Sequence, residues 1–229
     1  MRKRLLLIPL GIVMAVILAV VIGGPIISSA ISPKKVDPFS ITAVASAGTT
    51  TPRPVAADNG TWAVSSGSQA GYRVDEVLNG QALTVVGRTD KVTGSASVAD
   101  GKLTAANVVV DTASIATDNT GRDNYFRSTV MVASKYPQAT FTLGAPVALP
   151  QQIGGTPVPL SVPGTLAFAG EKRDVTADLK MVRDGAGIAA VGSIPIAVKD
   201  FGIDPPNLGF VKVEDHATVE FRVNLTQNG

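Results

Sequence analysis

Apolar and polar residues alternate with a period of two through most of the chain beyond residue 60. In the run ATVEFRVNL, residues 217–225, every odd position is apolar and every even position is polar. Successive side chains of a β-strand point to opposite faces, so this alternation predicts a strand with one buried face. The same pattern recurs in 175–181. Further strands are predicted in 61–65, 71–77, 83–98, 103–112, 140–147, 164–169 and 188–198.

Turn residues separate these predicted strands. The pairs Asn79-Gly80, Asp100-Gly101 and Asp184-Gly185 are typical of hairpin turns, and the proline-rich run 157–163 indicates another turn. Around eight strands with short connections, and no long amphipathic helix, predict an all-β fold with an antiparallel sheet that is closed or sandwiched. One helical turn is predicted in 119–132, with Asp118 or Thr120 as its cap.

The N-terminal region has a different character. After the basic residues 2–4, the run from Leu5 to Ile27 carries no charge. A helix needs roughly 20 residues to cross about 30 Å of hydrocarbon, so residues 1–30 predict a transmembrane anchor with its N-terminus in the cytoplasm. The alternative is a signal peptide cleaved near Ala30, because residues 28–30 are small. Both interpretations place the folded domain outside the cytoplasm.

Residues 31–59 are rich in Ala, Ser, Thr and Pro and contain few large apolar side chains. Such a segment buries too little surface to offset its ordering entropy, so we expect a flexible tether. A short strand in 39–44 is the alternative. The barrel domain would then occupy residues 60–229.

Charge and composition exclude several classes of function. Residues 1–58 carry six basic and two acidic side chains, whereas the remainder carries 14 basic and 16 acidic ones. The domain therefore offers no basic face for nucleic acid, and the positive excess lies beside the apolar segment, where anionic lipid would attract it. The chain has no cysteine and a single histidine, His216, which excludes disulfides, thiolate ligands and a two-histidine metal site.

Catalytic motifs are also missing from the sequence. There is no G-x-S-x-G elbow, phosphate loop or Rossmann glycine pattern. The carboxylates of Asp118 and Asp123 have the chemistry of an acid and base pair, but solvated loop carboxylates are the default interpretation. The Asp-Phe-Gly at 200–202 lacks the other kinase motifs. We therefore predict no enzyme activity, no catalytic or metal-binding residue and no required cofactor.

Several fragments in one order resemble a known family. They are Trp62, GYRV at 71–74, VVVDTASIAT at 108–117, RDNYFRSTVMVASKYPQATF at 122–141, GTLAFAGEKRDVTADL at 164–179 and DFGI at 200–203. Together they resemble the YceI-like family of lipid and polyisoprenoid binding proteins over residues 60–229. Two positions depart from the family's pattern, since Tyr125 stands where a histidine is common and a basic residue is displaced to Lys199.

The resemblance implies a lipocalin-like, eight-stranded antiparallel barrel whose hydrophobic cavity holds an isoprenoid chain. Among the residues that we expect to line the pocket, Phe126 and Met131 are favoured because a segment lying across a barrel mouth controls access. Arg122, Tyr125 and Arg127 are the candidate head-group contacts. The full set of candidate ligand-binding residues is Tyr72, Val74, Phe126, Met131, Phe141, Phe168, Phe201 and Phe221.

Side-chain size bears on whether such a barrel is hollow. An eight-stranded barrel either fills itself with side chains or holds one small ligand, and a domain rich in Ala, Gly, Val and Thr leaves room inside. The sequence thus predicts non-enzymatic binding of a long apolar lipid, of polyisoprenoid or isoprenoid-quinone type, for storage, transport or protection at the cell envelope. A structural or interaction module with a solid core is the main alternative, and a lipid-modifying enzyme is a weaker one. The identity of the lipid and the oligomeric state stay open.

Overall fold

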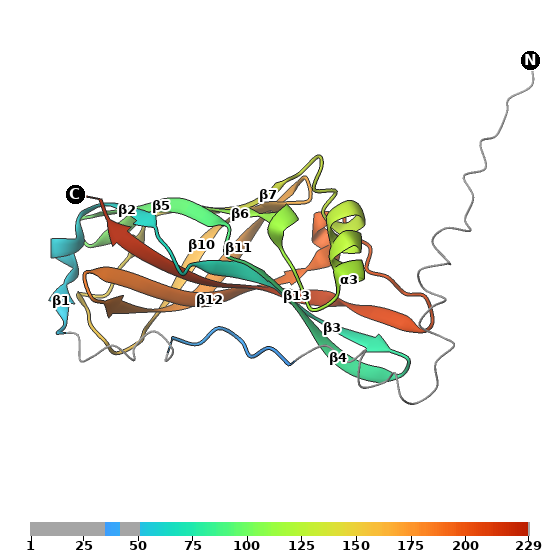
Figure 1. The fold of residues 1–229 in the computed structure, drawn as a ribbon. Coiled ribbons are helices and arrows are strands. Elements are labelled where there is room, and N and C mark those ends of the chain that lie inside the picture. The colour runs from blue at the N-terminus through green and yellow to red at the C-terminus, as the bar shows by residue number, and fades with distance from the viewer. Residues whose placement is uncertain (1–34, 42–50, 229) are drawn as a thin grey trace, which may run out of the picture. The chain divides into compact units, whose positions relative to one another are not determined.

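Eight antiparallel strands close into a barrel (Figure 1). Neighbouring strands in the ring are joined by antiparallel ladders, and the pairing of the first strand named below with the last one closes the ring. The predicted all-β antiparallel barrel with one short helix is confirmed. In ring order the strands are β12 (Gly187–Ala197), β11 (Glu171–Asp184), β10 (Val158–Phe168), β7 (Gln138–Leu143), β6 (Lys102–Asp111), β5 (Val92–Ala99), β2 (Gly60–Val64) and β13 (Val211–Gln227).

The computed structural model describes residues 35–41 and 51–228. In these two ranges no helix is long and apolar enough to cross a membrane. The predicted transmembrane or signal segment, residues 1–30, lies outside the described residues.

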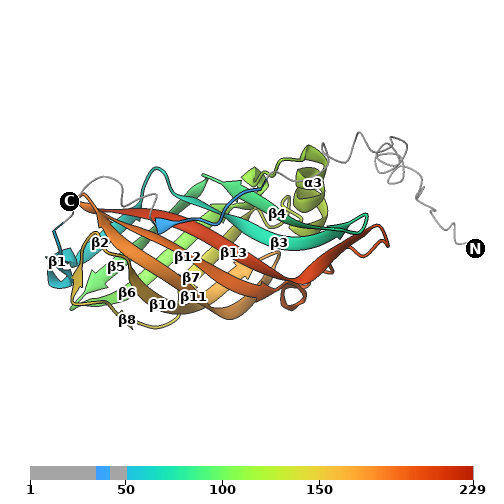
Figure 2. The ribbon, with the colours of Figure 1, turned by 90° about the horizontal axis from the view of Figure 1, so that it is seen from below.

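A hairpin of β3 (Gln69–Leu78) and β4 (Gln81–Thr89) lies beside the ring. β13 is long enough to pair with two strands along one edge, with β2 through Leu225–Gln227 and with β3 through its earlier residues. The predicted strand 83–98 is therefore two strands, because β4 stays with β3 whereas β5 pairs with β2. Figures 1 and 2 show this hairpin at the same end of the barrel as the helix α3 (Thr120–Tyr125).

The hairpin predictions hold at two turns. Asn79 and Gly80 have φ values of 50° and 80°, and Asp100 and Gly101 have 50° and 70°. Tight two-residue hairpins need positive φ at both central positions, which Asn, Asp and Gly tolerate best. Asp184-Gly185 likewise joins β11 to β12.

The turn predicted in 157–163 is wrong, because these residues begin β10. Pro159 and Pro163 pair with Lys180 and Thr176 of β11. On the other edge β7 joins β10 only from Gly164 onward, and no other strand of the described residues pairs with the earlier part of that edge. Proline is tolerated there because no neighbouring strand needs the missing N–H.

The predicted helical turn exists, but its cap is a different residue. The Asn119 side chain accepts a hydrogen bond of 3.0 Å from the N–H of Arg122, which makes it the cap of α3 in place of Asp118 or Thr120. A π-helical turn, η5 (Phe126–Val130), continues the helix. The remaining short elements are η4 (Thr112–Ser114), β8 (Val147–Ala148) and η6 (Val198–Phe201).

Part of the predicted tether belongs to the barrel instead. β1 (Arg53–Pro54) pairs with β9 (Gln152–Ile153), and the 3₁₀ helix η3 (Val55–Asp58) follows it. Val55 is 1% exposed and joins the same apolar cluster as Trp62. These elements cover one end of the barrel, where the buried Val55 and the pairing of β1 with β9 hold them against the core.

A second piece of the predicted tether, residues 35–41, contacts the outer wall of the barrel. The guanidinium of Arg88 lies 3.8 Å from the centre of the Phe39 ring and donates a hydrogen bond of 2.7 Å to the carbonyl of Asp37. Ile41 packs against Val182 and Ala189. In Figure 2 this blue segment lies over β12 and β13. The predicted strand in 39–44 is not seen in its described part, residues 39–41.

Candidate functional site

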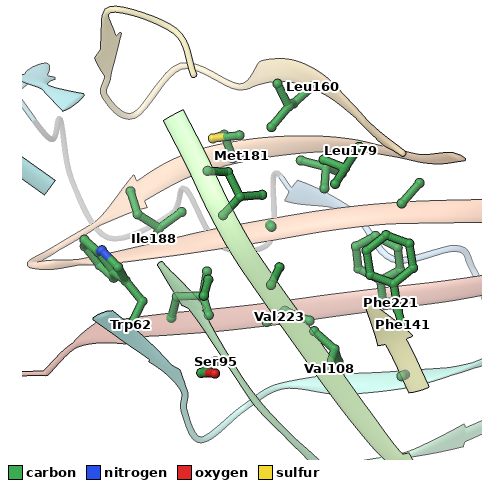
Figure 3. A pocket seen from close by; sticks show the side chains of 18 of the residues that line it. Trp62, Ser95, Val108, Phe141, Leu160, Leu179, Met181, Ile188, Phe221 and Val223 are labelled. Atoms are coloured by element: carbon green, nitrogen blue, oxygen red, sulfur yellow. The ribbon is translucent and has the colours of Figure 1, made fainter. Parts of the chain in front are cut away.

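The barrel encloses an apolar cavity of about 200 Å³ (Figure 3). Every strand of the ring contributes side chains to its wall. Along β6 the lining runs from Leu103 to Val110, which corresponds to about 23 Å along the strand. The cavity is therefore long and narrow, and it suits an extended chain better than a compact ligand.

The alternation of apolar and polar residues in the sequence determines which side chains of a strand face the cavity and which face outward. Val219, Phe221, Val223 and Leu225 of β13 all line the cavity, as the period-two pattern predicts. On the opposite face of the strand, Glu220 is only 4% exposed. Its carboxylate pairs with Arg88 at 2.6 Å and with Arg73 at 3.3 Å beneath the segment 35–41. At Glu220 the outer face of β13 is thus polar but shielded from solvent.

Two glycines leave room for aromatic rings of the cavity wall. Gly192 lies directly opposite Phe221 on the neighbouring strand, and a Cβ placed there would be 2.7 Å from the ring's Cζ. Gly164 leaves room in the same way for the ring of Phe141. Both rings therefore lie over glycine backbone along the wall. Sequence reasoning missed this arrangement because it depends on which residues face each other across strands.

Of the eight predicted ligand-binding residues, Phe141 and Phe221 line the cavity. The other six lie elsewhere among the described residues. Tyr72 stacks on Phe126 with ring centres 4.9 Å apart, and Phe168 stacks on Phe201 at 4.2 Å. Met131 is 2% exposed in the segment that follows α3, and Val74 lies on β3. These side chains pack against one another or against nearby core, and a ligand contact by any of them stays a prediction.

The candidate head-group residues make local contacts. Arg122 donates to Asp118 at 2.9 Å and to Glu76 at 3.4 Å. Arg127 donates to the Asn124 side chain at 2.8 Å, and Tyr125 is 43% exposed. Two of the three candidates are thus already hydrogen-bonded within the α3 end of the barrel.

Asp123 and Tyr72 occupy structural positions in the same region. The Asp123 carboxylate, 6% exposed, accepts hydrogen bonds from the backbone N–H and the hydroxyl of Thr117 at 2.8 and 2.7 Å. Burial raises the pKa of the Tyr72 phenol, and the nearby Arg122 charge opposes this only in part. Tyr72 is therefore neutral at physiological pH, and Asp123 holds the loop before α3 in place.

The opposite end of the cavity contains a buried ion pair that sequence reasoning missed. Arg183 donates to Asp58 at 2.5 Å and to the carbonyl of Ile153 at 3.2 Å. Both charged side chains are at least 96% buried, and Asp58 lines the cavity. The indole N–H of Trp62 donates to the Asp58 carbonyl at 2.9 Å. One signal was present: Arg183 extends the inward-facing series of residues 177, 179 and 181, where a charge is out of place.

Comparison with known proteins agrees with this barrel. The profile of the YceI-like domain matches residues 62–225, which is well over half of the chain. The chain belongs to the YceI-like family. The match begins after Asp58, so this YceI-like barrel includes β1 and η3 in addition to the matched region.

Solved structures share the fold of this YceI-like chain at low identity. A polyisoprenoid binding domain from Saccharophagus degradans, implicated in plant cell wall breakdown, has a TM-score of 0.57 and 18% identity over 73% of this chain and 98% of that one. Burkholderia cenocepacia BcnA has a TM-score of 0.51 and 20% identity over 67% of this chain and 95% of that one. A comparison with curated proteins gives no match.

The residue that departs from the family pattern near Asp-Phe-Gly has a local partner. Lys199 donates to Asp215 at 2.7 Å on the surface, and this hydrogen bond raises the pKa of the lysine. Within residues 35–41 and 51–228 no group of three or more His, Cys, Asp or Glu side chains is placed to hold a metal ion. The site to be explained is therefore the apolar cavity.

Proposed function

We propose that this YceI-like protein binds one long apolar lipid, of the polyisoprenoid or isoprenoid-quinone type, non-covalently inside its barrel. The observation that supports this most directly is the almost wholly apolar lining of a cavity that all eight strands of the ring enclose. Burial stabilises a bound chain by about 0.8 kcal/mol for each CH₂, so a long chain binds without strong polar contacts. The family membership and the polyisoprenoid binding domain of similar fold support the same ligand class.

The proposed role is non-enzymatic storage, transport or protection of that lipid at the cell envelope. The apolar run from Leu5 to Ile27 would hold the barrel at the membrane on its extracytoplasmic side. Protease treatment of intact and of lysed cells tests the location, because an extracytoplasmic barrel is cleaved in both. The mass of the mature N-terminus separates a retained anchor from cleavage near Ala30.

We place the ligand's entrance beside residues 122–136, at the α3 end. A helical segment lying across the end of a barrel opens at lower cost than a wall held by continuous strand hydrogen bonds. The π-helical turn η5 and the positive φ of Val132, 45°, mark this segment as irregular. A disulfide between a cysteine at Thr129 and a second cysteine on a facing strand would hold this segment closed. Lipid loading should then be slow in the oxidised protein and return to the wild-type rate after reduction.

The direct test of the function is extraction of the purified full chain with organic solvent, followed by mass spectrometry. We expect an isoprenoid lipid in near-stoichiometric amount, absent from the same chromatographic fractions of cells lacking the chain. Repeated failure to find any lipid, together with failure of the emptied protein to take up added isoprenoid, would refute the proposal.

The aromatic packing at the α3 end favours one alternative. The stacked pairs Tyr72–Phe126 and Phe168–Phe201 fill that part of the interior with the protein's own side chains. An envelope interaction module with a solid core would have such packing throughout. The enlargement of an inward-facing alanine separates the two functions, because only a hollow barrel tolerates it.

A further inference from the structure

Exposed apolar side chains gather at the α3 end of the barrel. Among residues 35–41 and 51–228 the exposed large ones are Tyr125, Val132, Leu208 and Phe210. The first two belong to α3 and the segment after η5, and the last two lie in the 204–210 loop before β13. The Asn79 N–H donates to the Phe210 carbonyl at 2.8 Å, so this loop lies against the tip of the β3–β4 hairpin, which Figures 1 and 2 show at the α3 end. Exposed apolar groups gathered at one end mark an interaction surface.

The 204–210 loop holds its two apolar side chains on an ordered backbone. Leu208 is 58% exposed and Phe210 is 41% exposed. The Leu208 N–H donates to the Val211 carbonyl at 2.8 Å, and an antiparallel bridge between Asn207 and Lys212 continues this pairing. Because the turn is already ordered, its insertion into an apolar phase costs little additional chain entropy.

The lysines that flank this loop in the sequence are paired with carboxylates. Lys199 lies 2.7 Å from Asp215, and Lys212 lies 2.9 Å from Glu214. Paired charges attract anionic head groups or an oppositely charged protein only weakly. The loop is therefore suited to shallow insertion into the interface of a bilayer, which depends on apolar side chains.

The direction of segment 35–41 relates this end of the barrel to the N-terminal apolar run. Near its start, Val36 accepts a hydrogen bond of 2.9 Å from Arg73 of β3, the strand that leads to the hairpin tip. At its end, Ile41 packs against Ala189, near the β11–β12 turn and the cluster that seats η3. The first residues of the segment are therefore the ones nearest the α3 end.

The chain between the apolar run and this segment is short. Lys35 follows Ile27 by eight residues, which is at most about 29 Å of extended chain. Arg73 pairs with Thr218, and β13 covers about 23 Å from there back to Val211, where the 204–210 loop ends. The loop thus lies within reach of a membrane that holds the apolar run. A free tether over 31–59 would instead have allowed about 100 Å.

We propose that the 204–210 loop inserts Leu208 and Phe210 into the interface of the membrane that anchors the chain, so that the α3 end docks on a lipid bilayer. This rests on the proposed anchoring and lipid binding, and it adds the orientation of the barrel. The entrance placed beside residues 122–136 then opens onto the bilayer. A lipid can pass between the bilayer and the cavity without crossing water.

Single labels at the two ends of the barrel test the orientation, because the chain has no cysteine of its own. N207C places a cysteine beside Leu208, and A186C places one in the exposed turn between β11 and β12. Each full-length variant is labelled with the environment-sensitive dye NBD and reconstituted in phosphatidylcholine vesicles with or without a doxyl-labelled lipid. The dye at position 207 is expected to shift to the blue and to be quenched by the doxyl lipid. The dye at position 186 is expected to do neither.

A double variant tests whether the apolar side chains cause the docking. L208S/F210S, made in the N207C background, is expected to lose the blue shift and the quenching. Both side chains are exposed, so the urea denaturation midpoint should stay close to that of the parent. The matched control is K212Q/E214Q, which removes an ion pair beside the same loop and keeps its apolar side chains. This control is expected to retain the quenching.

The outcomes separate this inference from the proposed function. An unquenched dye at position 207, or equal quenching at position 186, overturns the docking. Quenching that survives in L208S/F210S, or that is lost in K212Q/E214Q, also overturns it. A blue shift that rises with the protein-to-lipid ratio without quenching shows that a second copy covers the loop, and it overturns the docking as well.

Organic-solvent extraction of the same preparations tests lipid binding separately. A bound isoprenoid in a protein that does not dock overturns this inference alone. Docking by a protein that holds and takes up no lipid overturns the proposed ligand binding alone. Failure of the full chain to associate with the vesicles overturns the proposed anchoring together with the docking.

Discussion

Enlarging one inward-facing alanine measures whether the barrel is hollow. Ala106 lies on β6 and lines the cavity, whereas its neighbour Ala105 lies on the opposite, exposed face of the same strand. The replacements A106L and A105L add the same three carbon atoms at adjacent positions. The pair therefore differs in the direction of the side chain and not in chemistry.

The expected effect follows from the space that the new side chain enters. Three carbons buried at about 0.8 kcal/mol each contribute about 2.4 kcal/mol, and the ordering of a leucine side chain costs about 0.5 to 1 kcal/mol. A106L should therefore stabilise the ligand-free barrel by about 1.5 kcal/mol if the cavity is empty. In a filled core the same change would destabilise it by about 1 to 3 kcal/mol through overpacking. The two interiors thus predict opposite signs.

The assay is urea denaturation of the ligand-free full chain, followed by the emission of Trp62 and by far-UV circular dichroism. A105L should leave the free energy of unfolding within about 0.5 kcal/mol of the wild type. A106L should also weaken the binding of an added isoprenoid lipid, because the leucine occupies space that the ligand needs. A loss of stability in A106L with no change in A105L would show a solid core, and the cavity argument would be refuted.

Three further predictions concern other parts of the barrel. G192A places a Cβ 2.5 Å from the backbone oxygen of Asp178, 2.6 Å from Leu179 Cβ and 2.7 Å from the Phe221 ring, and it should cost about 1 to 3 kcal/mol of unfolding free energy while weakening lipid binding. An unchanged unfolding midpoint together with unchanged binding would contradict this, because the backbone of β11 and the Phe221 ring would then both have moved aside without cost. E220Q removes the charge of the buried carboxylate that pairs with Arg88 and Arg73. It should lower the free energy of unfolding, measured by urea denaturation, by about 3 kcal/mol. An unchanged urea midpoint would contradict this. Because burial raises the pKa of Tyr72, the unfolded chain ionises first and stability should fall above about pH 10. Y72F should show less of that fall, and identical pH profiles would refute the assignment.

Local patterns in the sequence were sufficient to predict most strands of the barrel wall. The alternation in 217–225 predicted the inward face of β13, because side-chain direction in a strand depends only on position along the chain. The Asn-Gly and Asp-Gly turns were equally readable, since they require positive φ at those residues. The prolines of 157–163 led to the wrong prediction of a turn. A strand accepts proline on an unpaired edge, and which edge of β10 is paired cannot be predicted from local sequence.

The candidate site was less readable from local pattern. Tyr72 and Phe126 were expected to line the pocket, yet their rings stack on each other, and the lining comes mostly from aliphatic side chains of the barrel strands. The polar end of the cavity joins two residues 125 positions apart, Asp58 and Arg183. Asp58 was assigned to the tether because residues 31–59 have a polar composition. The residue that pairs with Asp58 in the interior, Arg183, is distant in the chain.

The order of residues alone was enough to establish that this chain forms half-buried strands joined by tight turns and resembles a lipid-binding barrel family. Folding added the ring order of the strands, the seating of residues 35–41 over Glu220, the glycines that face aromatic rings and the ion pair at the end of the cavity. The difference has one physical cause. Side-chain alternation and turn geometry arise between neighbours in sequence, whereas burial, cavity shape and charge pairing arise between segments that meet only when the barrel closes.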